Sequence, residues 1–161
     1  MRPTLRHLAL PALCALTLSL AGCGGGDALE KKQLNPPRAS VQQLTVLPNG
    51  QWRLVLRLQN FSNRATDFTA INGNLSLGGH VAGGVSATPN INIGPESADT
   101  VEATVSPSLE AKTAVATALS GGQSVSYRLD GQITTSQRNA PYEFEYESSL
   151  NPAPGLPGVM R

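Results

Sequence analysis

The sequence predicts an all-β fold, an antiparallel β-sandwich with one short crossover helix. Apolar and polar residues alternate with a period of two in a series of short segments, which is the pattern of strands that bury one face. Gly, Pro and Asn residues separate these segments at intervals of about eight to twelve residues, as in β-sandwiches. A single Ala-rich segment lacks both features and predicts the helix.

The longest alternation covers residues 51–59. One face carries four apolar side chains: Trp52, Leu54, Leu56 and Leu58. The opposite face carries Arg53, Val55, Arg57 and Gln59. We therefore expect the first face to be buried and the second to be solvated. Pro48-Asn49-Gly50 precedes this segment, and because Asn-Gly favours a hairpin turn, the predicted partner is a strand over Val41–Leu47.

Shorter alternations predict six further strands: Ile71–Leu77, Val81–Ala87, Ile91–Ile93, Thr100–Val105, Val125–Ile133 and Tyr142–Glu147. Gly78-Gly79 closes the first of them as a turn, and Gly83-Gly84 thins the second. The helix is expected over 108–119, because Pro107 precedes this segment and Gly121-Gly122 follow it. Residues 40–150 are thus predicted to form one domain with a single core.

The N-terminal 22 residues have the features of a secretion signal. A basic start is followed by the apolar run Leu8–Leu20 and then by small residues. This run is shorter than the ~20 residues that a membrane-spanning helix needs. Leu20-Ala21-Gly22-Cys23 resembles a bacterial lipobox. The resemblance implies that a lipid is attached to Cys23, that the chain is cut before it, and that the new amino group is acylated, for example with palmitate. The alternative is an ordinary secretory signal in which Cys23 is an unmodified thiol.

Such processing would leave a mature chain with no free thiol, because Cys14 leaves with the signal and Cys23 carries lipid. The sandwich would then depend on its core rather than on disulfides. Loss of Arg2 and Arg6 would change the formal net charge from +1 to −1. A near-neutral chain with no basic cluster is not expected to bind nucleic acid.

The flanks of the domain are predicted to be irregular. Residues 23–39 are expected to comprise the lipidated Cys23 and a flexible tether, and residues 151–161 a disordered tail, because both are rich in Gly and Pro. In lipoproteins of this type the residue after the Cys directs sorting. Here it is Gly24 rather than Asp, which implies the periplasmic side of the cell outer membrane.

Four motifs occur in order over residues 40–147. Leu54–Asn60 is a long alternating strand that ends in Asn, and Ile71–Gly79 has the form apolar-x-Gly-x-Leu-x-Leu. Ile91–Ser97 is an Ile-x-Ile step with a Pro, and Tyr127–Ile133 reads Tyr-x-Leu-x-Gly-x-Ile. Together they resemble the late-embryogenesis-abundant type 2 family (LEA type 2), also known through its WHy domain. Where that family continues its first motif with Pro-Asn, this chain has Phe61-Ser62.

The resemblance to the LEA type 2 family implies an immunoglobulin- or fibronectin-III-like sandwich without enzymatic activity. It also implies an association with stress tolerance.

For each residue that could bind a metal, catalyse a reaction or stack on a sugar, the sequence context favours a structural role. His80 has no second His or Cys in the predicted mature chain to help it bind a transition metal. Glu143, Glu145 and Glu147 could bind Ca²⁺ or form an acid pair, but a straight strand spreads its carboxylates, so a charged face that protects an edge strand is preferred. Trp52 is interpreted as core rather than as a sugar-stacking platform, because aromatic residues make up only 4% of the chain.

These observations favour a non-enzymatic lipoprotein, anchored through Cys23, that is stress-protective or binds another envelope protein. No catalytic residue, cofactor, metal or small-molecule substrate is expected. A pilus- or secretion-associated lipoprotein that donates or accepts a strand is the alternative. An envelope enzyme subunit is less favoured, because no set of acid, base, nucleophile or metal ligands stands out.

Overall fold

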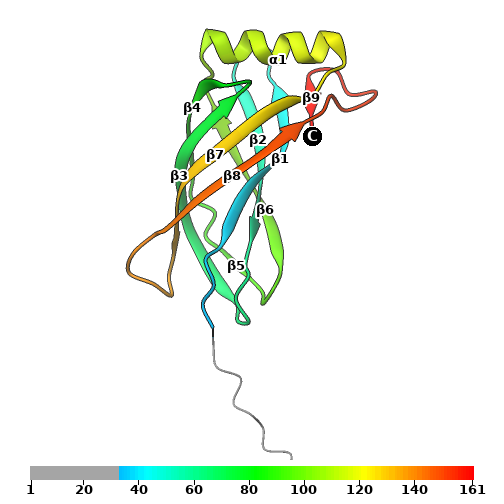
Figure 1. Ribbon diagram of the computed structural model, residues 1–161. Coiled ribbons are helices and arrows are strands. Elements are labelled where there is room, and N and C mark those ends of the chain that lie inside the picture. Colours follow the sequence, from blue (N-terminus) through cyan, green and yellow to red (C-terminus); the bar gives the residue numbers. More distant parts are fainter. Residues whose placement is uncertain (1–32) are drawn as a thin grey trace, which may run out of the picture. The chain divides into compact units, whose positions relative to one another are not determined.

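Nine strands and one helix make up the part of the chain that the computed structural model describes, residues 33–161 (Figure 1). In chain order they are β1 Arg38–Val46, β2 Trp52–Gln59, β3 Thr66–Leu77, β4 His80–Ala87, β5 Ile91–Ile93, β6 Ala98–Val105, α1 Leu109–Gly121, β7 Val125–Thr135, β8 Tyr142–Leu150 and β9 Val159–Met160. One sheet has the order β6-β2-β1-β9. The other has the order β4-β3-β7-β8, with β5 paired to β3. All strand pairs are antiparallel, so the predicted all-β sandwich is confirmed.

The β1–β2 hairpin has the predicted turn and the predicted burial. Gly50 adopts a positive φ of 78° in the turn, and Val46 pairs with Trp52 beside it. The four apolar side chains of β2 are at most 1% exposed, whereas Arg53 and Arg57 on the opposite face are exposed. Because consecutive side chains of a strand point to opposite faces, this register places one complete face of β2 in the core.

Helix α1 connects β6 of one sheet to β7 of the other, as a crossover helix should. It begins where the Ser108 side chain caps it by accepting a hydrogen bond from the Ala111 backbone N–H. It ends at Gly122, whose left-handed conformation suits glycine. Ala111, Val115 and Ala118 face the core, so one side of the helix closes that end of the sandwich.

Two glycines of the sequence motifs face each other across β3 and β7. Gly73 pairs with Gly131, and a Cβ on Gly73 would collide with the Asp130 carbonyl. A Cβ on Gly131 would collide with the Asn72 carbonyl and with the Cα of Gly73. The two strands can approach this closely only because neither residue has a side chain.

The C-terminal segment is folded, so the predicted disordered tail over 151–161 is wrong. Met160 pairs with Leu44 of β1 and is completely buried. The backbone N–H of Asn151 donates to the Arg161 carbonyl, and that of Arg161 donates to the Asn151 carbonyl, which joins the two ends of the segment. Gly155 and Gly158 have φ values of 75° and 73°, so the glycines that suggested disorder form turns that return the chain to the sheet.

The predicted tether over 23–39 is too long at its C-terminal end. Strand β1 begins at Arg38, Ala39 is completely buried, and Asn35 is already hydrogen-bonded to the domain. The prediction was wrong there because the Pro pair before β1 packs against the sandwich, and Pro37 is buried. The predicted signal peptide over 1–22 and Cys23 lie outside the described residues.

Within residues 33–161, no helix is both long and apolar enough to cross a lipid bilayer.

Candidate partner-binding surface

The segment that precedes β1 is hydrogen-bonded to the loop between β2 and β3. The Gln33 backbone N–H donates to the Asn63 side chain at 2.9 Å. The Asn35 backbone N–H donates to the Ser62 hydroxyl at 3.0 Å, and the Asn35 amide donates to the Phe61 carbonyl at 2.7 Å. Phe61 and Ser62 are the two residues that depart from the LEA type 2 pattern, and in this chain they hold the segment that leads into β1.

Asn60 fixes the shape of this loop. Its side chain is 1% exposed, and its amide nitrogen lies 2.8–3.1 Å from the carbonyl oxygens of Arg64, Ile93 and Gly94. Its side-chain oxygen accepts the Ser62 backbone N–H at 3.0 Å. A buried amide with these partners is fully satisfied, and it joins the β2–β3 loop to the end of β5.

This loop and helix α1 lie at opposite ends of the sandwich (Figure 1). Strand β3 starts next to the loop, where Thr66 donates to the Arg64 carbonyl, and ends next to the helix, where Gly78 approaches Ala114. Twelve residues of strand lie between these points, and they span about 40 Å at ~3.3 Å per residue. The segment before β1 therefore meets the domain far from α1.

The outer face of β7 and β8 carries a group of charged side chains centred on Arg128. Its guanidinium lies 2.7 Å from Glu145, 3.7 Å from Glu147 and 3.5 Å from Asp130. Glu143, on the same face, accepts a hydrogen bond from the Gln132 amide at 2.6 Å. These four carboxylates and one guanidinium have a formal charge of −3. All five charged side chains reach solvent, so each ion pair is worth little stability and the group acts mainly through its net charge.

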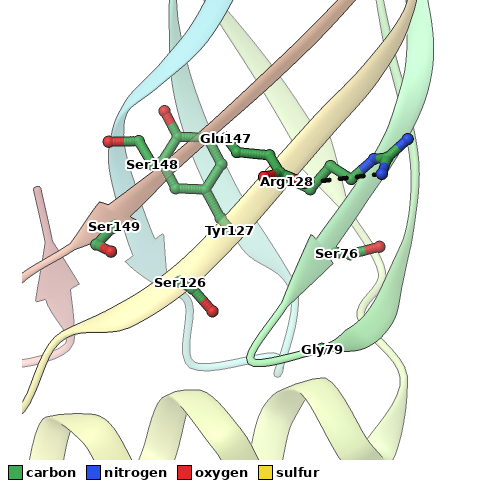
Figure 2. A pocket seen from close by; sticks show the side chains of 8 residues that line it. All are labelled: Ser76, Gly79, Ser126, Tyr127, Arg128, Glu147, Ser148 and Ser149. Atoms are coloured by element: carbon green, nitrogen blue, oxygen red, sulfur yellow. Dashed lines mark ion pairs between the residues drawn. The ribbon is translucent and has the colours of Figure 1, made fainter.

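A shallow depression of about 550 Å³ lies on this face (Figure 2). Arg128 and Glu147 form an ion pair there, and Ser76 of the neighbouring strand β3 lines another side. Ser126, Ser148 and Ser149 supply further hydroxyl groups. The lining is therefore polar, with serine hydroxyls beside the Arg128–Glu147 ion pair.

Tyr127 links the two sheets where β1 runs past β7 and β8. The Val41 backbone N–H donates to the Tyr127 hydroxyl at 3.2 Å, and that hydroxyl lies 3.4 Å from the Val41 carbonyl. Burial raises the pKa of Tyr127 above its ordinary value of 10.0, with the hydrogen bond to Val41 acting in the opposite direction. The Tyr127 hydroxyl therefore supplies a buried polar link between sheets that share no backbone hydrogen bonds at this position.

Between the Tyr127–Val41 link and the β2–β3 loop, a groove separates β8 from the segment before β1. Pro36, Pro37, Arg38 and Phe61 form one wall, and Glu143, Phe144 and Glu145 form the other. The groove has a volume of about 340 Å³. The guanidinium of Arg38 lies 5.2 Å from the Phe61 ring centre and 5.4 Å from that of Tyr146, which marks the end of the groove nearest Tyr127.

Asp67 organises the loops at the same end of the sandwich as Asn60. Its carboxylate accepts hydrogen bonds from Asn92, Ser136 and Gln137 at 2.6–2.9 Å. The bonds from Asn92 and Ser136, with a smaller contribution from Gln137, hold the pKa of Asp67 below its ordinary value of 3.8 against the opposing effect of burial. The β7–β8 loop, which leads into β8, is thereby fixed to β3 and β5.

The residues singled out in the sequence lie either in the core or on the surface of the sandwich. Trp52 is 1% exposed in the core, as predicted. His80 lies exposed at the start of β4, and Glu143, Glu145 and Glu147 point to solvent from β8. Among residues 33–161, no three His, Cys, Asp or Glu side chains are placed so that they could hold a metal ion.

Three features of this surface were missed in the sequence: the Arg128 ion pairs, the Tyr127–Val41 link and the docking of Asn35. Each joins segments whose pairing or proximity depends on the tertiary fold. Arg128 and Glu147 are cross-strand neighbours in β7 and β8. If these two strands had been paired as a hairpin, the opposite charges of the two residues would have indicated the ion pair.

No protein-family model matches this sequence, and no curated protein matches it. Among solved structures, the chain is similar to a protein from Archaeoglobus fulgidus with a TM-score of 0.42 and 14% identity, over 75% of this chain and 98% of that one. It is also similar to a protein from Arabidopsis thaliana with a TM-score of 0.48 and 11% identity, over 84% of this chain and 94% of that one.

Proposed function

We propose that this protein is a non-enzymatic lipoprotein of the bacterial envelope, anchored through Cys23 on the periplasmic side of the outer membrane, whose sandwich binds a partner protein. The observation that carries the anchor is the sequence Leu20-Ala21-Gly22-Cys23 directly after a short apolar run. An acylated Cys23 holds a protein on a membrane without a spanning helix, because several acyl chains together bury many CH₂ groups at ~0.8 kcal/mol each.

The position of the docked segment supports a partner-binding role. The segment before β1 meets the sandwich at the β2–β3 loop, about 40 Å from α1 by the length of β3. Only nine residues, 24–32, separate Cys23 from the described chain. An anchor at Cys23 would thus restrain the loop end of the domain and leave the helix end open to partners.

Replacement of Cys23 by Ser tests the anchor. We expect the Cys23→Ser chain to remain an uncut precursor without lipid, whereas the wild-type protein from the membrane fraction should begin at an acylated Cys23 by mass spectrometry. Cys14→Ser is the matched control, because Cys14 lies within the apolar run, and this variant should be processed and acylated normally.

A mature N-terminus at any residue other than an acylated Cys23 would contradict the proposal. So would Cys23→Ser protein that is cut at the same bond and released in soluble form. Either result would favour an ordinary secretory signal. If Cys23 is acylated, separation of inner and outer membranes by density tests the location, and recovery of the acylated protein in the inner membrane would refute the outer-membrane assignment.

A further inference from the structure

The half of β8 that follows the β7–β8 loop is an unpaired sheet edge. Strand β8 is the last strand of its sheet, and among residues 33–161 its backbone is hydrogen-bonded to no strand other than β7. Its second half begins at Tyr146, whose ring contacts the guanidinium of Arg38. Its first half is Tyr142–Glu145, and residues 143–145 line a groove together with Pro36, Pro37, Arg38 and Phe61. We call Tyr142–Glu145 the free edge.

On the other side of the sandwich, the start of β4 is bonded to the residue that caps α1: the Ser108 backbone N–H donates to the Ala82 carbonyl and the Ser108 hydroxyl donates to the Val81 carbonyl. Along an outermost antiparallel strand, alternate residues direct N–H and C=O groups away from the sheet. The free edge borders a groove of about 340 Å³, and its outward-directed backbone groups are available to an added strand.

The charged side chains around this edge bear on the choice of occupant. Glu143 and Glu145 flank the groove on the outer face, whereas Arg38 on the opposite wall contacts the Phe61 and Tyr146 rings. Arg138 lies over the Tyr142 ring. Arg128 already contacts Asp130, Glu145 and Glu147, and none of the ion pairs within residues 33–161 involves Glu143. A second copy of this chain paired antiparallel through β8 would place glutamates opposite glutamates, which is unfavourable. A strand with Lys or Arg on its outer face would place opposite charges there instead.

The inner side of the groove has different chemistry. Phe144 is 9% exposed and points inward between the two glutamates, and Phe61 and Pro37 lie across from it. Every second residue of an added strand would face these apolar groups, because side chains alternate along a strand. The bound segment should therefore alternate basic and apolar residues.

We propose that the free edge binds an extended segment of a partner protein, by strand addition, in which basic and apolar residues alternate. Backbone hydrogen bonds to β8 would provide the pairing, Glu143 and Glu145 would recognise the basic side chains, and Phe61 and Phe144 would contact the apolar ones. This inference deepens the proposed partner-binding role and rests on it, but it does not depend on the lipid.

The test uses the full chain in detergent and a short labelled peptide in which Lys and Val alternate, with binding followed by fluorescence anisotropy. We expect Glu143→Lys, which leaves the Arg128 ion pairs intact, to weaken binding by about tenfold, as expected for removal and reversal of a close charge contact. Glu102→Lys is the matched control, because Glu102 is exposed on the edge strand β6 of the other sheet, and it should bind like wild type.

Two further peptides separate strand addition from attraction of charge alone. A peptide of the same sequence with alternate backbone nitrogens methylated keeps its charge but loses N–H donors, and it should bind at least about tenfold more weakly. A peptide with the same composition but the Lys residues grouped should also bind more weakly. Hydrogen exchange should show new protection of the Tyr142–Glu145 amides when the alternating peptide is bound.

Equal binding of the methylated or the grouped peptide would overturn the proposal, as would equal binding to Glu143→Lys or no binding of the alternating peptide. Failure here is distinguishable from failure of the anchor. The Cys23→Ser chain should bind the peptide as wild type does. An acylated Cys23 without peptide binding would refute only the strand addition, and peptide binding by a wild-type protein that carries no acyl group on Cys23 would refute only the anchor.

Discussion

At the scale of single residues, burial changes at every step along β2. Leu56 is completely buried, whereas Arg57, the next residue, is exposed on the opposite face. Neighbouring residues of one strand therefore contribute to stability by different mechanisms. Leu56 contributes through removal of apolar surface from water and close packing, whereas Arg57 remains solvated and forms no ion pair within residues 33–161.

Leu56→Ala should reduce the free energy of unfolding by about 2–5 kcal/mol, because the core loses both transfer free energy and packing contacts. Arg57→Ala, the matched control, should change it by less than about 0.5 kcal/mol, as is usual for exposed positions. Urea unfolding followed by circular dichroism measures both. Equal losses would mean that both faces of β2 are covered, and a larger loss for Arg57→Ala would reverse the register.

At the scale of elements, the strand positions were predictable because a half-buried strand alternates apolar and polar residues. The β1–β2 hairpin and the β3–β4 pair were identified in this way, whereas the helix was identified from Pro107 before it and Gly121-Gly122 after it. The short β9 was missed because two residues are too few to show a period, and the Pro and Gly residues before it are common in both turns and disordered tails. Met160 is buried only because the turn returns it to Leu44.

The C-terminal segment gives a direct test at this scale. Met160→Ala should cost about 2–5 kcal/mol of stability, as for a buried Met elsewhere. Leu156→Ala, in the same segment but 45% exposed, should stay within about 0.5 kcal/mol of wild type. Denaturant unfolding of both variants checks this expectation. If Met160→Ala were as stable as Leu156→Ala, the segment would not contribute a strand to the sheet in solution.

At the scale of the whole molecule, the two sheets are held together by side chains. Most of this contact is apolar, from the shared core of both sheets. Tyr127 adds a polar link, because its hydroxyl is bonded to the backbone of Val41 in the opposite sheet. The link depends on protonation, since a buried phenolate is strongly disfavoured.

Tyr127→Phe should reduce stability by about 1–3 kcal/mol at neutral pH, because the Val41 N–H is left buried without its partner. The raised pKa of Tyr127 also has a defined consequence for pH. A group whose pKa is higher in the folded state makes its full contribution to folding stability at pH values below its pKa in the unfolded state, here 10.0. That contribution is lost as the pH rises through the pKa of the folded state.

Wild-type stability should therefore fall above about pH 10, and the Tyr127→Phe variant should lose less stability over the same range. Chemical unfolding at a series of alkaline pH values measures the difference between the two proteins. Identical alkaline slopes would mean that Tyr127 titrates normally and that its hydroxyl is not buried between the sheets.

The sequence by itself determined the fold class, the buried face of each long strand and the position of the helix, which was predicted over 108–119 and spans Leu109–Gly121. These are properties of local alternation, turn chemistry and capping, and each can be identified within about a dozen residues. Sequence alone also provides the case for a lipidated Cys23, because a processing enzyme recognises a short contiguous motif.

Only the tertiary structure decided which strands lie side by side and what their edges offer. The Arg128 ion pairs, the Tyr127–Val41 link and the burial of Met160 join residues that are distant in sequence or belong to different sheets. The free edge of β8 exists because β8 is the last strand of its sheet and its first half borders a groove rather than another strand. Local patterns cannot determine such positions, because they follow from how whole sheets pack against each other.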